Sequence, residues 1–267
     1  MKISEIITFL ESNGDFINYQ HTRDHLLIGD DHQDVNQVIV CWVASLPIIK
    51  KAIQSNFHFI ISHENPFYLS STNLPNILLS AQQEKKVIIK EHSISIYRCH
   101  DLWDGIPDVG VRDTWAKIMN IPFKPCQPQD YIRISEPTNR PLSYFINTIA
   151  KSIQPYGETG IEVIGDPNHE VRTLGIGTGA CTDVFEMVAN GADTCIVSDD
   201  GINNWSSIQW AHDHHIPLIV VSHMACEAPG IKSMADFLND SIPDVQFEFR
   251  KRIINTSSFQ PTPGLSS

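Results

Sequence analysis

The chain of 267 residues lacks several features that would assign it to a common class. It has six cysteines and none of them lies in a C-x-x-C pair, which argues against a thiolate zinc site and a disulfide scaffold. It has 19 Lys and Arg against 31 Asp and Glu, a net charge of −12. Its longest basic run is Arg250-Lys251-Arg252. Binding to a phosphate backbone needs a basic stripe, so we predict no nucleic-acid partner.

Long apolar runs are also lacking. The N-terminal segment MKISEIITFLESNGDF is interrupted by Glu5 and Glu11, unlike a secretory signal peptide. No stretch reaches the length of a membrane span, so we predict no membrane partner. Scattered cysteines in apolar runs are typical of small buried thiols, which indicates a cytoplasmic protein.

Short apolar runs alternate with helical patterns along most of the chain, which predicts an α/β fold with mostly parallel strands. The strand-like runs are 38–43, 57–61, 94–97, 174–176, 194–197 and 218–221. The predicted helices are 47–55, 108–120, 142–153, 183–190, 205–214 and 231–239.

Proline is dense between residues 121 and 141, which suits a connector or an edge better than a core helix. We therefore expect two α/β lobes. The expected parts are an N-terminal lobe over 1–121, a Pro-rich connector over 122–141, a C-terminal α/β segment over 142–253 and a loose tail over 254–267.

Polar and titratable side chains follow four of the strand-like runs. These stretches are Ser62-His63-Glu64, Cys99-His100-Asp101 with Asp104, Ser198-Asp199-Asp200, and Ser222-His223 with Glu227. Ligands of parallel α/β sheets bind beyond the carboxyl ends of the strands. We therefore expect these side chains to converge.

Two imidazoles and three carboxylates of this group could hold one or two divalent cations. The five candidate ligands are His63, Glu64, Asp104, His223 and Glu227. A set this rich in carboxylates suits a two-metal site between the lobes. Imidazole beside carboxylate, without thiolate, favours zinc, manganese or iron. In the alternative interpretation, the histidines are hydrogen-bonded strand-end residues and Glu227 is a helix N-terminal acid.

A glycine-rich stretch supports a second interpretation. Gly175, Gly177 and Ala180 match G-x-G-x-x-A between a strand-like run and a predicted helix, and the next strand ends at Asp199. This arrangement is typical of an NAD-linked oxidoreductase. A tight turn that needs glycine for a positive φ is the simpler alternative.

The same stretches resemble the Nif-three-like proteins, also called GTP cyclohydrolase 1 type 2 homologues or domain of unknown function 34. The resemblance covers roughly residues 1–250 and is most specific at the late His-x-x-x-Glu element. The matching stretches are Ile60–Pro66, Val87–Asp104, Gly175–Ala180 with the strand ending at Asp200, and Leu218–Glu227.

The resemblance implies a dinuclear metal centre on the same five residues. It also implies a metal-dependent hydrolase of a small nucleotide-like or phosphorylated molecule, and a homo-oligomer, commonly a hexameric ring. The chain departs from the family pattern at several positions. Among them, Glu64 replaces a second histidine, and Asn204 replaces a histidine that could move protons. A non-catalytic metal-binding or interaction protein is the alternative.

His100 is the candidate catalytic residue. It ends the strand-like run that also presents Asp104, and an imidazole with an unperturbed pKa near 6.5 suits proton transfer. Its alternative role is to orient a metal ligand without touching the metal.

Overall fold

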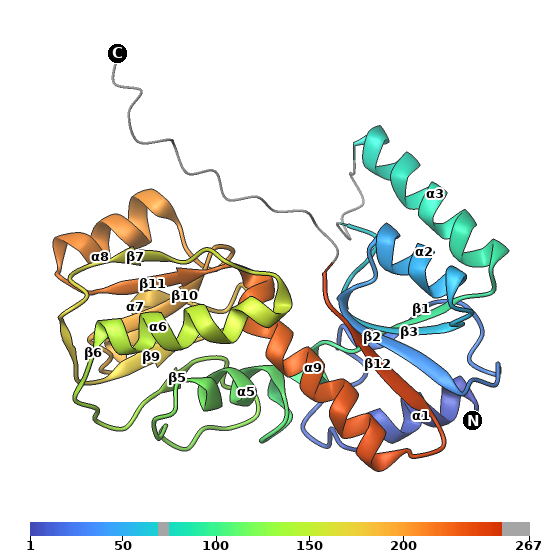
Figure 1. The fold of residues 1–267 in the computed structure, drawn as a ribbon, viewed down its shortest axis with the longest axis horizontal. Coiled ribbons are helices and arrows are strands. Elements are labelled where there is room, and N and C mark those ends of the chain that lie inside the picture. Colours follow the sequence, from blue (N-terminus) through green and yellow to red (C-terminus); the bar gives the residue numbers. More distant parts are fainter. Residues whose placement is uncertain (69–74, 253–267) are drawn as a thin grey trace.

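Two five-stranded sheets organise the chain into two lobes (Figure 1). The computed structural model describes residues 1–68 and 75–252. The first sheet has the order β1-β4-β3-β2-β12, in which only the edge strand β1 is antiparallel to its neighbour. Its strands are β1 (His25–Ile28), β2 (Gln37–Val43), β3 (Phe59–Glu64), β4 (Ser95–Arg98) and β12 (Gln246–Arg250).

Helices cover both faces of the first sheet because alternate residues of its strands point to opposite sides. On β2, Val38 and Val40 join a core cluster with α1 (Ile3–Glu11) and α9 (His223–Ser241), whereas Ile39 and Cys41 join a cluster with α2 (Leu46–Gln54). The helices of this lobe are α1 (Ile3–Glu11), α2 (Leu46–Gln54), α3 (Asn76–Glu91) and α4 (Asp101–Gly105).

The second sheet has the order β5-β9-β10-β11-β7, with three parallel central strands and an antiparallel strand at each edge. Its strands are β5 (Arg133–Ile134), β7 (Glu162–Ile164), β9 (Leu174–Ile176), β10 (Thr194–Ser198) and β11 (Leu218–Val221). Strands β6 (Arg140–Pro141) and β8 (Glu170–Val171) form a separate pair. Helix α6 (Leu142–Ile153) packs on one face and α7 (Val184–Ala189) on the other.

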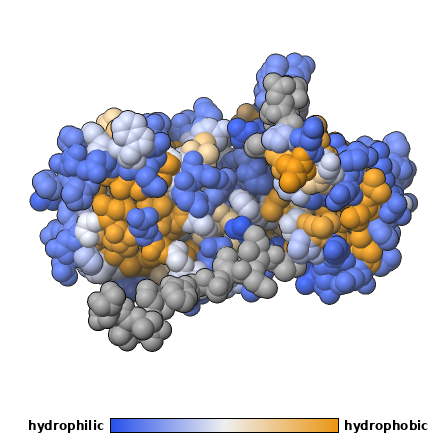
Figure 2. All heavy atoms as spheres, turned by 90° about the horizontal axis from the view of Figure 1, so that it is seen from above, coloured by the Kyte–Doolittle hydropathy of each residue, from blue (hydrophilic) through white to orange (hydrophobic). Residues whose placement is uncertain are grey.

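The helical segments of this part of the chain are α5 (Val111–Ile118), α6 (Leu142–Ile153), the 3₁₀ turn η1 (Gln154–Tyr156), α7 (Val184–Ala189), the π-helical turn η2 (Asn204–Ile208) and α8 (Gln209–Asp213). In the space-filling view, apolar surface shows over each lobe and the surface between the lobes is largely hydrophilic (Figure 2).

Helix α9 (His223–Ser241) joins the two lobes. It begins directly after β11 of the second sheet and leads into β12 of the first. It passes so close to α5 that a Cβ on Gly230 would lie 2.4 Å from the Cα of Val111. The Trp103 indole donates a hydrogen bond to the Gly230 carbonyl at 2.8 Å. These contacts hold α9 at Gly230, close to the side chains that its first two turns present, against α4 and α5.

The α/β fold expected from the sequence is confirmed, and helix 142–153 has the predicted bounds. Three differences have a physical cause. The predicted helix 108–120 is shorter, because α5 begins only at Val111 after its N-cap Gly110, and Asp108 and Asn120 on either side have positive φ. The predicted helix 231–239 begins at His223, since Pro229 is accommodated within it. Strand β12 belongs to the range 142–253 but pairs with β2 in the first sheet, so this range is not confined to the second lobe.

The Pro-rich range 122–141 contains the short edge strand β5 and reaches β6. The expected tail, 254–267, lies outside the described residues. No helix in residues 1–68 and 75–252 is both long and apolar enough to cross a membrane.

Candidate metal centre

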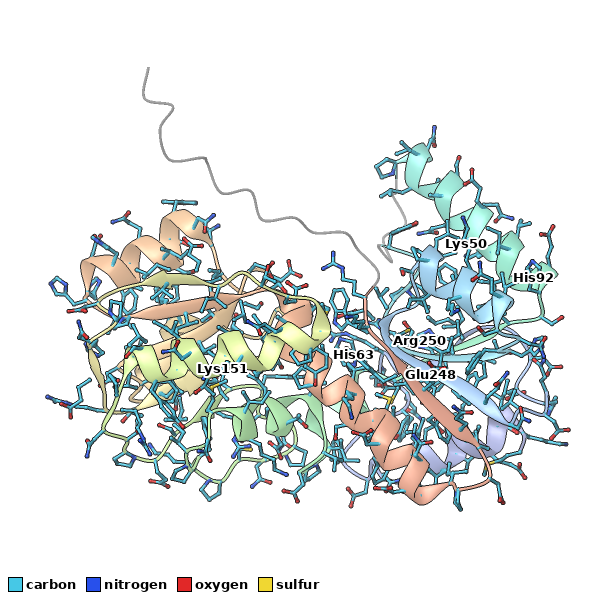
Figure 3. All side chains as sticks on the ribbon, in the orientation of Figure 1. Lys50, His63, His92, Lys151, Glu248 and Arg250 are labelled. Atoms are coloured by element: carbon cyan, nitrogen blue, oxygen red, sulfur yellow. The ribbon has the colours of Figure 1, made fainter. Side chains whose placement is uncertain are left out.

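His63 lies at the carboxyl end of β3, between the two lobes, and is completely buried (Figure 3). Its Nδ1 is 3.0 Å from the backbone carbonyl oxygen of Cys99. A carbonyl can only accept, so Nδ1 carries the proton. The other ring nitrogen, Nε2, lies 3.4 Å from Asp104 Oδ1 and 3.5 Å from Glu227 Oε2. In the neutral ring, Nε2 therefore presents a lone pair to two carboxylate oxygens.

Asp104 is brought to His63 by the short helix α4, which follows β4. The helix begins where it does because Asp24 caps it: the buried Asp24 carboxylate accepts hydrogen bonds from the backbone N–H groups of His100, Asp101 and Leu102, the last two at 3.0 and 2.8 Å. A carboxylate at a helix N-terminus satisfies N–H groups that have no partner inside the helix. Asp24 thus sets the position of Asp104.

Glu227, in the second turn of α9, connects the two sides of the cluster. Its Oε2 accepts a hydrogen bond from the Trp42 indole at 2.7 Å and faces His63. Its Oε1 lies 3.0 Å from His223 Nε2, one helical turn earlier. The side chain is buried, with 4% of its surface exposed. Each carboxylate oxygen of Glu227 therefore faces a different histidine.

His223 is the first residue of α9 and is held by two acids at the end of β10. Its backbone N–H donates to Asp199 Oδ1 and its ring Nδ1 to Asp200 Oδ2, both at 2.7 Å. Nε2 is left to face Glu227 and, at 3.6 Å, Glu64 Oε1. Burial alone would lower the pKa of His223, but Glu227, Asp200 and Glu64 raise it to about 9.

Glu64 ends β3, and its carboxylate is directed between the imidazoles of His100 and His223. Its Oε1 lies 3.4 Å from His100 Nε2, and its Oε2 accepts a hydrogen bond from Arg98 at 2.9 Å. Burial would raise the pKa of Glu64, but His100, His63 and Arg98 outweigh it and hold the pKa well below its usual range. The Glu64 carboxylate is therefore ionised.

His100 stacks on His63 with ring centroids 4.5 Å apart. Its Nδ1 lies 3.0 Å from Asp101 Oδ1 and 3.1 Å from Asp104 Oδ2, so Nδ1 carries a proton. Burial would lower the pKa of His100, but Asp104, Asp101 and Glu64 raise it to about 12. His100 is therefore a buried cation among carboxylates when no metal ion is bound.

The glycine-rich turn after β9 faces this cluster. Gly179 has φ +54°, and a Cβ there would lie 2.5 Å from Glu227 Oε1 and 2.8 Å from His223 Nε2. Glycine is thus required for space as well as for φ. The N-terminus of α7 is capped by Asp183, which accepts from Phe185 and Glu186 N–H at 2.8 and 3.1 Å. Because a carboxylate occupies this helix end, the geometry opposes the pyrophosphate site of an NAD enzyme.

The structure brings the five candidate ligands and His100 into one cluster. Two sets of three side chains have ligand atoms within 4.8 Å of one another: His63, His100 and Asp104, and His63, Glu64 and Glu227. His63 Nε2 and Asp104 Oδ1 are buried and have no hydrogen-bond partner among the described residues. Such atoms fit a metal ion, because buried nitrogen and oxygen acceptors need a positively charged or donating partner.

Sequence reasoning missed two residues that support the cluster, Trp42 and Asp24, and the role of a third, Asp200. The strand-end pattern places Asp200 beside the site, and only its bond to His223 was not foreseen. Trp42 and Asp24 have no comparable signal, since their partners are far away in the chain.

A family model described as Duf34/NIF3 (NGG1p interacting factor 3) matches residues 1–259. A curated relative from Clostridium acetobutylicum, called a GTP cyclohydrolase 1 type 2 homolog, is 19% identical over 223 residues, which are 81% of each chain.

Two solved structures illustrate the likeness of fold. The hypothetical protein SA1388 from Staphylococcus aureus has a TM-score of 0.76 at 20% identity, over 98% of this chain and 99% of that one. Reduced HcgD from Methanocaldococcus jannaschii has a TM-score of 0.75 at 21% identity, over 93% of this chain and 97% of that one. At such identities the likeness concerns the fold.

Proposed function

The chain belongs to the Duf34/NIF3 family, and from this premise we propose that it is a metal-dependent hydrolase with a dinuclear centre. The proposed ligands are His63, Glu64, Asp104, His223 and Glu227. The proposed substrate is a small phosphorylated or nucleotide-like molecule, and the proposed metals are zinc, manganese or iron.

One observation carries the proposal: the environment of His63 Nε2. Its ring is oriented by the Cys99 carbonyl, so that Nε2 is directed at Asp104 Oδ1 and Glu227 Oε2. Lone pairs of three acceptors facing one another at about 3.5 Å repel unless a proton or a cation lies among them. A histidine whose other nitrogen donates to a carbonyl is the usual arrangement of a metal ligand.

The charge of the cluster favours divalent cations. The three proposed carboxylate ligands, Glu64, Asp104 and Glu227, are all largely buried. Two divalent cations would exceed their negative charge and leave the centre attractive to an anionic group. Without metal, protonated His100 and His223 supply part of the compensation, so metal uptake and proton release are coupled.

The side chains around the ligands have distinct roles in this proposal. Bound divalent ions would lower the pKa of a water molecule and polarise the substrate oxygen. Asp200 orients His223, and Trp42 orients Glu227. We propose His100 for proton transfer, because its Nε2 is directed into the cluster while Nδ1 is held by Asp101 and Asp104.

The name of the clostridial relative supports a nucleotide substrate, and the hexameric ring implied by the family resemblance supports a homo-oligomer. Elemental analysis after metal-replete expression tests the centre, and we expect about two ions per chain. Turnover of a panel of nucleotides and phosphoesters tests catalysis. Metal uptake without any turnover would favour the second candidate, a non-catalytic metal-binding protein; protein without metal would overturn both.

A further inference from the structure

A hollow of about 660 Å³ lies beside the candidate metal centre, on the second lobe. Two loops, which contain Ala180 and Gly201, border both the hollow and the candidate metal centre. Ala180 and Cys181 line the hollow and directly follow Gly179, whose backbone touches the metal centre. Gly201 also lines it and directly follows Asp200, the partner of His223. Burial and then the carboxylates of Asp101 and Asp104 raise the pKa of the Tyr131 hydroxyl, another group at the hollow.

The walls of the hollow are held in place by buried and capped groups. The guanidinium of Arg112, which is 5% exposed, donates to the carbonyls of Gln127, Pro128 and Asp130 at 2.7, 3.1 and 2.7 Å. This fixes the segment that leads to Tyr131. The opposite wall is α7, whose first turn is held by the Asp183 cap. Such preformed hollows of a few hundred Å³ are typical of small-molecule sites.

The lining combines exposed aromatic rings with free polar groups. Tyr131 and Phe185 expose 47% and 44% of their surfaces, although both are aromatic. The Glu186 carboxylate and the Lys124 ammonium also line the hollow, and neither has an ion-pair or side-chain hydrogen-bond partner in the described part of the chain. Aromatic faces take flat rings, and a free carboxylate accepts hydrogen bonds from N–H groups.

We infer that this hollow, defined by Tyr131, Phe185, Glu186 and Cys181 and called the ring pocket below, binds a planar nitrogen heterocycle of the substrate. The ring presents N–H donors to Glu186 and an apolar face to Phe185, while an anionic part of the same molecule reaches the metal centre. The inference rests on the proposed function, and it adds where the substrate lies and which part of it the second lobe selects.

The experiment uses the full-length, manganese-loaded protein and two probes, guanosine 5′-monophosphate and ribose 5-phosphate, in calorimetric titrations. Only the first probe carries a ring. We expect Phe185→Leu and Glu186→Gln each to weaken binding of the nucleotide by roughly tenfold or more, and to leave ribose 5-phosphate binding unchanged. Glu162→Gln, an exposed acid on β7, is the control and should change neither.

The two hypotheses fail in different ways. Wild-type protein that takes up metal but binds both probes equally, or variants that bind the nucleotide as tightly as wild type, would overturn the ring pocket and leave the metal centre standing. Protein without metal would overturn the proposed function. In that case guanosine alone is titrated: binding that is lost in Phe185→Leu would support the ring pocket, and the absence of binding would overturn it.

Discussion

The two histidines that face Glu227 lie in different surroundings. His63, from the first lobe, has no exposed side-chain surface, and a backbone carbonyl orients it. His223, from the start of α9, exposes 15% of its side chain, and the carboxylate that orients it, Asp200, exposes 66%. We call His63 with Asp104 the buried half of the centre, and His223 with Asp200 the open half.

Because of this difference, the two halves differ in whether a proton or a metal ion satisfies the histidine nitrogen. In the buried half, His63 Nε2 and Asp104 Oδ1 lack a partner among the described residues, and a cation would supply one. In the open half, the neighbouring carboxylates raise the pKa of His223 to about 9 against the effect of burial. A proton therefore completes this half at neutral pH, and a metal ion must displace it. We expect the buried half to hold its ion more tightly.

The largest effect is expected from Glu227→Ala, which removes a buried carboxylate whose two oxygens lie 3.5 Å from His63 Nε2 and 3.0 Å from His223 Nε2. Both metal ions should be lost, and any hydrolysis with them, while the fold persists. Elemental analysis after gel filtration measures the metal content, and Glu162→Ala on β7 is the matched control. Retention of both ions in Glu227→Ala would contradict a bridging role.

Replacing each histidine in turn tests the asymmetry directly. His63→Ala should lose both ions and also destabilise the fold by about 1–3 kcal/mol, because it leaves a cavity in a buried site. His223→Ala should retain about one ion and unfold near the wild-type temperature. Metal content and thermal unfolding are measured on the same samples. If His63→Ala retained an ion and His223→Ala lost both, the buried half would not be the tighter site.

The sequence could predict where the candidate ligands gather but not what positions them. Parallel strands present polar residues at their carboxyl ends, so His63, Glu64 and His223 could be expected at one edge of the fold. The sequence also names Asp104 as a candidate ligand, but it does not show what positions it, because the helix that carries it depends on a cap from Asp24, far upstream. Contacts between distant parts of a chain leave no local periodicity.

Strand β12 and helix α3 are absent from the sequence-based prediction. The run Gln246–Arg250 alternates apolar and polar residues as a strand does, but its partner is β2, near the other end of the chain. Helix α3 buries only Lys85 and Ile89 along its length and has a weak apolar face. In contrast, α6 has a strong one, with Leu142, Phe145 and Ile149 buried at helical spacing, and its bounds were predictable.

Asp200→Asn should have a smaller effect, confined to the open half. The neutral amide can still accept from His223 Nδ1 but no longer makes the ring more basic, so affinity for one ion should fall about 10- to 100-fold. Competition with a chromophoric chelator measures both affinities. Asp213→Asn, another exposed acid of the second lobe, is the control. A similar loss at both ions would mean that the halves are not independent.

The smallest effect is expected from Asp24→Asn, the corresponding change behind the buried half. Asp24 touches no candidate ligand side chain, but its carboxylate holds the first N–H groups of α4. Asparagine retains one acceptor oxygen and turns an N–H donor towards the helix, which should cost about 1–2 kcal/mol of unfolding free energy. Chemical denaturation measures it, with exposed Asp34→Asn as the control. Because the packed lobe around His63 keeps the ligand geometry in most molecules, metal affinity should fall far less than in Asp200→Asn. A large loss of metal with unchanged stability would instead show that the buried half depends on the charge of Asp24, and that both halves are tuned by their outer carboxylates.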